Sequence, residues 1–327
     1  MEVKDDEMMK QQLPLVSICI PTYNRSNYLK KTLAAIISQK PFRENKVELV
    51  VSDNASTDGT KDFMENLLKK YPQIRYHRNP QNIRDENFPL VLGIATGKLR
   101  CLCNDTLIYK RNHLQNLCNM VLRYDREKPV IFFGNGNCRY RRKEERVYRD
   151  MDSAMQDISY WLTWLGGITV WADDCADIEK DTEHCKLFLW QTGKMLKLMK
   201  KKQVVVVNNI PFGKVQTIPN KDVSYGIYKV FYENFFSILT PYVIEQSLSQ
   251  ETLGKIKKDI LYRFFVNNMA AWENTDKKFL YGKEDLVKKI LAKYEGEDYY
   301  DSFLRYYQVK KIMYPIKQYI KKLVKGE

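Results

Sequence analysis

Three short polar segments, each following an apolar run, carry the side chains best suited to chemistry. They read "PTYNR" over 21–25, "SDNASTDG" over 52–59 and "CNDT" over 103–106. Tyr23 offers a ring for stacking, and Asp53 and Asp105 offer carboxylates that accept directional hydrogen bonds or bind a cation. The question these residue types raise is whether the segments hold a metal ion, a nucleotide or neither.

Taken alone, the second segment has two other interpretations. Residues 54–65 nearly match a calcium loop, with an amide, a hydroxyl, a carboxylate, a glycine and a final glutamate at the expected offsets. An EF-hand needs a helix before its loop, whereas "VELVV" is β-branched and typical of a strand. The remaining alternative is a strand-to-helix turn in which Asp53, Ser56 and Asp58 only accept hydrogen bonds from backbone N–H groups.

The elements that must position these segments alternate along the first 135 residues. Apolar runs predict strands at 15–20, 47–52, 73–77, 98–103 and 129–135, and helical spacing predicts helices near 26–37, 60–68, 87–95 and 112–124. Ser26 is a candidate N-cap for the first helix, and Asp58 or Thr60 for the second. This alternation predicts an α/β fold with a mostly parallel, twisted sheet flanked by helices. Ligands bind at the carboxyl ends of such strands, so the three segments should converge on one cavity.

The second half of the chain predicts a different organisation. A charge-dense stretch over 138–152 is expected to be a solvated hairpin or another surface excursion. It is followed by an aromatic stretch with a Gly166-Gly167 pair, a helix over 182–201 and a strand over 203–209. From about residue 224 the pattern is mainly helical. We therefore expect one domain over 1–222, with halves at 15–137 and 150–222, and a helical C-terminal region over 223–327.

Composition restricts the classes of function. The 327 residues carry a net charge of +14 and seven cysteines, which we expect to be reduced, and no leader-like or membrane-spanning apolar run occurs. Candidate partners for this charge are nucleic acid, an anionic membrane or phosphorylated ligands. Basic residues are spread along the chain instead of clustering with aromatics on one module, which disfavours nucleic acid. The first strand is not followed by GxGxxG, which disfavours a dinucleotide-linked oxidoreductase.

The last 23 residues concentrate the basic charge. Apolar residues recur at helical spacing (Val309, Ile312, Met313, Ile316, Ile320 and Leu323), with six lysines on the remaining face. Such a basic amphipathic helix is predicted to lie on an anionic membrane surface, gaining about 1 kcal/mol per cation near the headgroups. The alternative is a terminal helix that packs on the rest of the protein with its lysines solvated.

The three polar segments, in this order and spacing, resemble family 2 glycosyltransferases of the GT-A fold. The similarity rests on "VSICIPTYNRSNYLKKTLAAIISQ", "VELVVSDNASTDGT" and "NPQNIRDENFPLVLGIATGKLRCLCNDTLIYKRNHL", over about 16–114. The stretch "ISYWLTWLGGITVWADDC" is similar to bacterial members that build O-antigen or capsule. The resemblance implies an enzyme that transfers a sugar, with inversion, from a nucleoside diphosphate donor to a hydroxyl of a lipid-linked glycan in surface polysaccharide biosynthesis. It would be cytoplasmic and peripherally bound to the inner face of the plasma membrane.

The resemblance also assigns donor-binding residues. Pro21, Thr22, Tyr23 and Arg25 would line the base and ribose, Asp53 would accept the base's ring N–H, and Asn54 would stand in for a second acid. The third segment departs from the family's Asp-x-Asp pattern, because it reads Asn104-Asp105-Thr106. Asp105 and Thr106 are the remaining candidates for binding Mg²⁺ or Mn²⁺. If such an ion binds weakly, Arg84 or Lys98 could balance the charge of the leaving diphosphate.

A general base must remove the proton of the acceptor hydroxyl, and the family places an acid at the start of a helix beyond the glycine pair. Glu183, His184 and Asp181 stand there, ranked in that order, and their spacing does not choose among them. Acids at a helix start are also common for purely electrostatic reasons. Two other functions stay open: a protein that binds nucleotide sugar without transferring it, and a protein that binds anionic surfaces or nucleic acid.

Overall fold

The computed structural model describes residues 13–138, 144–209, 211–216, 225–275 and 285–325. Its central sheet has the order β3-β2-β1-β4-β8. The first four strands are parallel, and β8 joins the edge of β4 in the opposite direction. Their bounds are β1 (Val16–Thr22), β2 (Val47–Asp53), β3 (Ile74–Arg78), β4 (Leu99–Leu102) and β8 (Thr169–Trp171). The predicted α/β fold with a mostly parallel sheet is confirmed.

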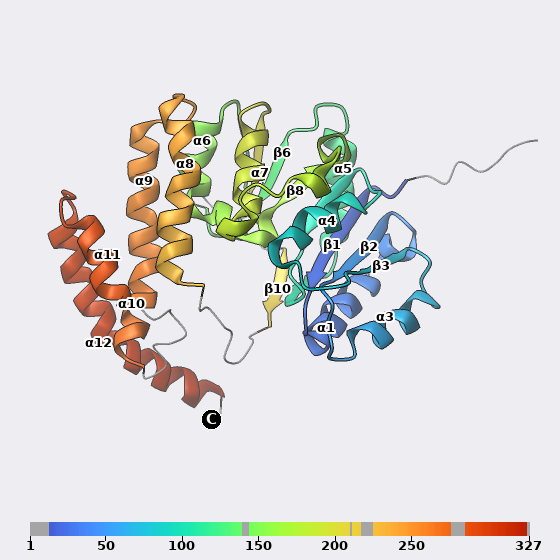
Figure 1. Cartoon of the computed structure of the whole chain (residues 1–327), viewed down its shortest axis with the longest axis horizontal. Helices are drawn as coiled ribbons and strands as arrows, with labels where there is room; N and C mark the ends of the chain where they lie inside the picture. Colours follow the sequence, from blue (N-terminus) through green and yellow to red (C-terminus); the bar gives the residue numbers. More distant parts are fainter. Residues whose placement is uncertain (1–12, 139–143, 210, 217–224, 276–284, 326–327) are drawn as a thin grey trace, which may run out of the picture.

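The register of these strands brings the polar segments together. Thr22 pairs with Asp53, and Asp53 pairs with Arg78, so β1, β2 and β3 end side by side. All seven residues of β2 are buried, because helices cover both faces of the sheet. Those helices are α1 (Ser26–Ile37), α2 (Lys40–Arg43), α3 (Thr60–Leu68), α4 (Asn87–Gly93) and α5 (His113–Tyr124), and Figure 1 shows them around the blue strands.

The first helix is capped by a residue from the second loop. The Asp58 carboxylate accepts a hydrogen bond from the backbone N–H of Ser26 at 2.8 Å and another from the Thr60 hydroxyl at 2.6 Å. Burial raises the pKa of Asp58, but these hydrogen bonds outweigh it and leave the pKa below its usual value. Ser26 itself makes no capping bond, and α3 begins after Gly59 at φ 80°. The prediction that Ser26 caps α1 is therefore wrong, whereas Asp58 bonds to the start of α3 and links the first two loops.

The predicted fifth strand does not join the central sheet. β6 (Val130–Phe133) pairs in parallel with β9 (Val204–Val207), which pairs antiparallel with β7 (Glu145–Tyr148). One bridge between Phe132 and Ile168 connects this smaller sheet to the segment before β8. A further pair that the sequence did not indicate, β5 (Leu107–Tyr109) with β10 (Phe212–Val215), lies beyond the third polar segment. The helices of this half are α6 (Met151–Ile158) and α7 (Trp190–Met199).

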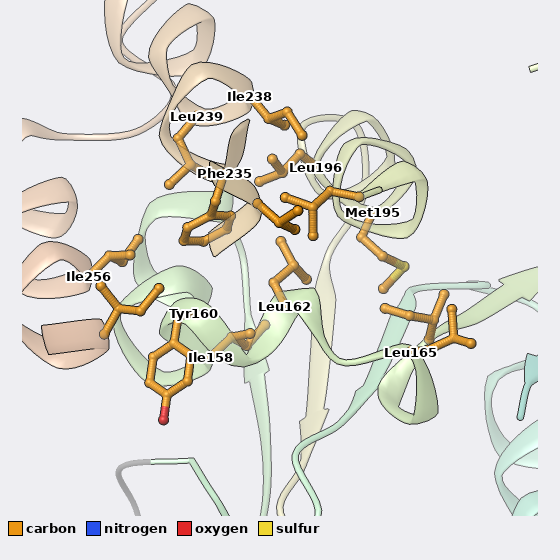
Figure 2. Packing of buried hydrophobic residues seen from close by; sticks show 14 of the residues in the cluster. Ile158, Tyr160, Leu162, Leu165, Met195, Leu196, Phe235, Ile238, Leu239 and Ile256 are labelled. Atoms are coloured by element: carbon orange, nitrogen blue, oxygen red, sulfur yellow. The ribbon is translucent and has the colours of Figure 1, made fainter. Parts of the chain in front are cut away.

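The C-terminal region is helical, as predicted. It contains α8 (Phe235–Ile244), α9 (Gln250–Ile260), α10 (Val266–Glu273), α11 (Leu286–Tyr294) and α12 (Tyr300–Lys325), drawn in orange and red in Figure 1. Phe235 and Leu239 of α8 and Ile256 of α9 pack against Ile158 and Leu196, as Figure 2 shows. The predicted boundary between 222 and 223 falls at 217–224, outside the described residues. In the described part, the C-terminal helices share one buried core with the middle of the chain.

None of the helices in the described part of the chain combines the length and the apolar character that crossing a membrane requires.

Candidate active site

A cavity of about 510 Å³ opens at the carboxyl ends of the central strands. One wall comes from the first and third polar segments, and a second wall comes from Asn54 and the 3₁₀ turn at Arg84–Glu86. The rest of the lining comes from the second half of the chain, through Phe188, Gln191 and the π-helical turn at Lys229–Asn234. Segments distant in the sequence therefore line one cavity.

Most of the donor-binding candidates lie in this wall. Eight of the ten line the cavity: Pro21, Thr22, Tyr23, Arg25, Asn54, Arg84, Asn104 and Asp105. Tyr23 is 44% exposed, so its ring is available to a ligand. The remaining two, Asp53 and Lys98, are not among the lining residues.

Asp53 is fully buried and serves the protein's own loops. One carboxylate oxygen accepts the backbone N–H of Ser56 at 2.8 Å, and the other accepts the Tyr76 hydroxyl at 2.8 Å and the Arg78 guanidinium at 2.7 Å. Burial raises the pKa of Tyr76, and its hydrogen bond to Asp53 adds to this. Both oxygens of Asp53 have protein partners, so these contacts match the alternative of a loop-holding turn and do not support direct contact with a base.

Lys98 lies at the wrong end of the sheet for donor binding. Its backbone N–H bonds to Pro14, just before β1 begins, and its ammonium pairs with Asp125 at 2.5 Å. The cavity is at the other end of these strands. The position of Lys98 therefore does not support the role that the sequence suggested.

Arg84 is held in a strained conformation by a network of amides. Its φ is 52°, in the left-handed region that favours glycine. Asn54 donates to the carbonyl of Arg84 at 3.3 Å, and Asn82 accepts the backbone N–H of Arg84 at 2.9 Å. The side chain of Asn54 also accepts from Asn79 and from the backbone of Ile83. These contacts fix a cation at the cavity wall.

Asp105 is 1% exposed and is bonded through both carboxylate oxygens. Thr22 donates its hydroxyl to one oxygen at 2.9 Å, and Arg25 donates to the other at 3.2 Å. The hydroxyl of Thr32 donates to the backbone carbonyl of Asp105 at 2.7 Å. These contacts hold the residue in one orientation.

A divalent cation does not fit these residues well. Both Asp105 oxygens face protein donors, its neighbour Asn104 is an amide, and Thr106 is buried and is not among the cavity-lining residues. Across the described residues, no three His, Cys, Asp or Glu side chains gather in a way that could hold a metal ion. Mg²⁺ and Mn²⁺ prefer sites built on carboxylates and phosphate oxygens, so this donor set is poor.

The candidate bases lie outside the cavity wall. The helix expected over 182–201 begins only at Trp190, because His184 and Phe188 have φ of 67° and 58° and interrupt it. Glu183 pairs with Lys197 at 2.6 Å on the surface, and Asp181 lies 3.7 Å from the same ammonium. The prediction that these residues start a helix is wrong.

His184 is held by packing against α7. A Cβ on Gly193 would come within 2.0 Å of the imidazole ring, so the ring lies directly over that glycine. Burial lowers the pKa of His184. None of the three candidate bases is among the lining residues.

The sequence analysis missed Asp85, a carboxylate that does line the cavity. Burial raises its pKa to about 6, and the charge of Arg84 opposes this only in part. In the same cavity lining, the rings of Phe188 and Tyr225 stack at 5.7 Å, and Gln191 has a buried Oε1 that lacks a partner among the described residues. The available signal was an acid between the third predicted strand and the next helix, where parallel sheets bind ligands.

Comparisons with known proteins agree with this geometry. Residues 17–175 match the model of Glycosyl transferase family 2. Abequosyltransferase RfbV of Salmonella typhimurium (strain LT2) is 35% identical over 117 residues, which is 33% of this chain and 35% of that protein. The GalNAc(5)-diNAcBac-PP-undecaprenol beta-1,3-glucosyltransferase of Campylobacter jejuni is 37% identical over 67 residues, 20% of this chain and 21% of that protein. The chain thus spans about a third or less of these relatives.

Solved structures extend the likeness to the whole fold. The S. aureus TarS 1-349 complex with UDP-GlcNAc has a TM-score of 0.52 at 16% identity and covers 92% of both chains. The mannosyltransferase PcManGT from Pyrobaculum calidifontis, in complex with GDP-Man and Mn²⁺, has a TM-score of 0.50 at 14% identity, covering 91% of this chain and 87% of that one. Residues 17–175 are therefore similar to the family 2 glycosyltransferases, and the chain has the GT-A fold of these solved structures.

Proposed function

We propose that this chain is an inverting glycosyltransferase that moves a sugar from a nucleoside diphosphate donor to a hydroxyl of a lipid-linked glycan, in the synthesis of a bacterial surface polysaccharide. The observation that carries the proposal is the single cavity, which joins an aromatic ring, two guanidinium groups and a carboxylate of raised pKa. The names of the relatives support the reaction class and the lipid-linked acceptor. The TarS complex supports a nucleotide-sugar donor.

The donor would bind against the three polar segments and the turn at Arg84–Glu86. Tyr23 stacks on the base, and the cations of Arg25 and Arg84 face the diphosphate, because guanidinium groups bind phosphate oxygens in a fork. Asn54 and Asn104 offer amide groups along the same wall. Asp53 contributes indirectly by holding the second loop in place.

The acceptor would occupy the wall built by the second half of the chain. Phe188 and Tyr225 present stacked rings of the kind that cover the apolar face of a sugar. Asp85 removes the proton of the attacking hydroxyl, whose oxygen then bonds to the anomeric carbon while the bond to the diphosphate oxygen breaks. A carboxylate with a pKa near 6 suits this task, since it is ionised at neutral pH and still basic enough to take a proton.

A thermal-shift panel of nucleoside diphosphates and nucleotide sugars tests the donor class, because a ligand that binds only the folded state raises its melting temperature. Radiolabelled sugar transfer to lipid-linked acceptors then separates transfer from binding alone. We expect Asp85→Asn to keep donor binding and lose transfer, while the surface variant Glu183→Gln keeps both. Donor binding without transfer to any acceptor would favour the non-catalytic alternative.

The last helix supports a membrane role. The first turns of α12 are anchored by the buried Phe303 and Tyr307. Beyond them the apolar side chains are exposed, with Ile312 at 66%, Ile320 at 52% and Leu323 at 61%. At about 100° per residue, the exposed apolar residues from 309 to 323 fall within an arc of about 120°, and Lys310, Lys311, Lys317 and Lys321 lie on the rest of the helix surface. This matches a helix that inserts its apolar face into an anionic membrane surface, here the inner face of the plasma membrane.

Flotation with vesicles tests this role. We expect the protein to float with phosphatidylglycerol vesicles and to bind phosphatidylcholine vesicles weakly, and the double variant Ile316→Glu, Ile320→Glu to lose flotation. Ile244→Glu is the matched control, because Ile244 is 77% exposed but lies at the end of α8. Equal flotation of the double variant and the control would refute membrane insertion by α12.

The proposal keeps the predicted division of the chain into a domain over 1–222 and a helical region over 223–327. In it, residues 15–137 hold the donor, 150–222 contribute to the acceptor wall, and 223–327 form the helical region with the membrane-binding end.

A further inference from the structure

We propose that the guanidinium of Arg25 holds the donor diphosphate and neutralises charge that a divalent cation would otherwise balance, with Asp105 as the residue that positions it. This inference rests on the proposed function and names how the same site neutralises its leaving group. It replaces the expectation that Asp105 and Thr106 bind Mg²⁺ or Mn²⁺.

The first support is that Asp105 is committed to protein partners. Thr22 and Arg25 bond to its two carboxylate oxygens at 2.9 and 3.2 Å, and Thr32 bonds to its carbonyl. A cation would have to displace Arg25 from a carboxylate that is 1% exposed. Removing the hydrogen-bonded partner of a buried carboxylate is unfavourable unless the entering ion supplies equivalent contacts. The neighbouring amide of Asn104 supplies no charge.

The second support is the position of Arg25 itself. Its side chain is 36% exposed and lines the cavity, so it is paired on one side and accessible on the other. Its recorded bond to Asp105 uses Nη1, and a guanidinium carries five N–H donors in a rigid plane. Asp105 thereby fixes the plane while further donors remain for phosphate oxygens. A lysine ammonium is a point charge without this rigid fork, so it could not bond to Asp105 and hold a phosphate group in a fixed plane in the same way.

The chemistry balances without a metal ion. In the displacement, the acceptor oxygen forms its bond to the anomeric carbon, and the electron pair of the broken bond leaves on the diphosphate oxygen. Arg25 stabilises that added negative charge, with Arg84 as a second cation in the same wall. The acceptor proton goes to Asp85, so no oxidant, reductant or further reactant is needed.

Calorimetric titration of the full chain with UDP and GDP, in EDTA and in MnCl₂, tests the inference. We expect the tighter-binding nucleotide to have the same Kd in both conditions. Arg25→Ala should weaken that diphosphate about 10-fold to 100-fold, in line with the loss of charge-assisted hydrogen bonds, and Arg25→Lys should recover part of this. The corresponding monophosphate, UMP or GMP, should bind Arg25→Ala as it binds the original chain.

Two further variants separate positioning from folding. Asp105→Asn should weaken diphosphate binding equally in EDTA and in MnCl₂, because it frees Arg25 to leave its orientation. Arg123→Ala is the matched control, since Arg123 pairs with Glu145 on the surface at a side-chain exposure of 60% and does not line the cavity. It should change neither Kd.

The outcomes are distinguishable. Diphosphate binding that requires MnCl₂ would overturn this inference and leave the proposed function intact. Equal weakening of monophosphate and diphosphate by Arg25→Ala would also overturn it, because Arg25 would then support the site as a whole. Failure of both nucleotides to bind in either condition would refute the proposed function, and the inference with it.

Discussion

Replacing Asp85 with Asn removes a titratable carboxylate from the cavity while nearly keeping its size. The pKa of Asp85 is raised to about 6 from an ordinary value of 3.8, so the carboxyl group binds its proton more tightly in the folded protein than in the unfolded chain. With a pKa near 6, about 90% of the groups are ionised at pH 7 and about 10% at pH 5. If Asp85 is the base, kcat/KM should fall roughly tenfold between these pH values and level off above about pH 7.

The raised pKa of Asp85 also determines how Asp85→Asn changes the free energy of unfolding. Because the folded pKa is raised, the stabilising contribution of Asp85 is present below about pH 4 and is lost as the pH rises through about 6. A shift of about two pKa units corresponds to about 3 kcal/mol, and partial solvent exposure of the side chain should reduce this to between about 1 and 2 kcal/mol. Asp85→Asn should therefore be more stable than the original chain at neutral pH.

The assay measures both quantities on one pair of proteins. We expect Asp85→Asn to lower the rate of sugar transfer by about 10² to 10⁴, typical of a lost general base, while urea unfolding at pH 7 shows the gain in stability. At about pH 4 the two proteins should unfold at nearly the same urea concentration. Unchanged kcat in the variant, together with a flat pH profile of the original chain between pH 5 and 7, would refute the assignment of Asp85 as the base.

Three other changes follow from the site's geometry. Arg84→Gly should relieve the positive φ and gain up to about 1 kcal/mol in unfolding free energy while weakening nucleotide binding, whereas Asn112→Gly, at φ 67° away from the cavity, should leave binding unchanged. Equal binding loss in both would contradict this. Asp53→Asn should cost about 2 kcal/mol in denaturant unfolding, because it weakens the charge-assisted hydrogen bonds of a fully buried carboxylate, while Asp125→Asn, in an exposed pair, should cost less than about 1 kcal/mol. Similar costs would show that Asp53 does not hold the loops. Ile316→Glu alone should reduce flotation with anionic vesicles, and unchanged flotation would count against insertion of α12.

The sequence was sufficient for the features that repeat at short range. Alternation of apolar runs and helical spacing predicted the parallel strands, and the rule that ligands bind at their carboxyl ends placed Tyr23, Arg25 and Asp105 at one cavity. It did not reveal that β6 belongs to a second sheet, because strand partners such as β9 are more than 70 residues away along the chain. The apolar content of a strand does not show which sheet it joins or which strand it pairs with.

The errors at the site have a similar origin. The residues over 182–201 have helical spacing, but the left-handed backbone at His184 and Phe188 depends on packing that spacing does not encode. Asp53 has an acceptor's chemistry, but its donors Tyr76 and Arg78 come from the neighbouring strand. Asp85 has an ordinary sequence context, and its raised pKa arises only from burial in the folded cavity.

The buried contacts between α8, α9 and the middle of the chain bear on how the protein can be cut into pieces. A fragment ending before Phe235 would leave Ile158 and Leu196 without their covering helices, as Figure 2 makes visible. Such a fragment should expose a large apolar surface and aggregate instead of retaining activity. Helices α8 and α9 are thus expected to unfold together with the middle of the chain in one cooperative transition, and an expression experiment that removes the C-terminal helices should yield insoluble material.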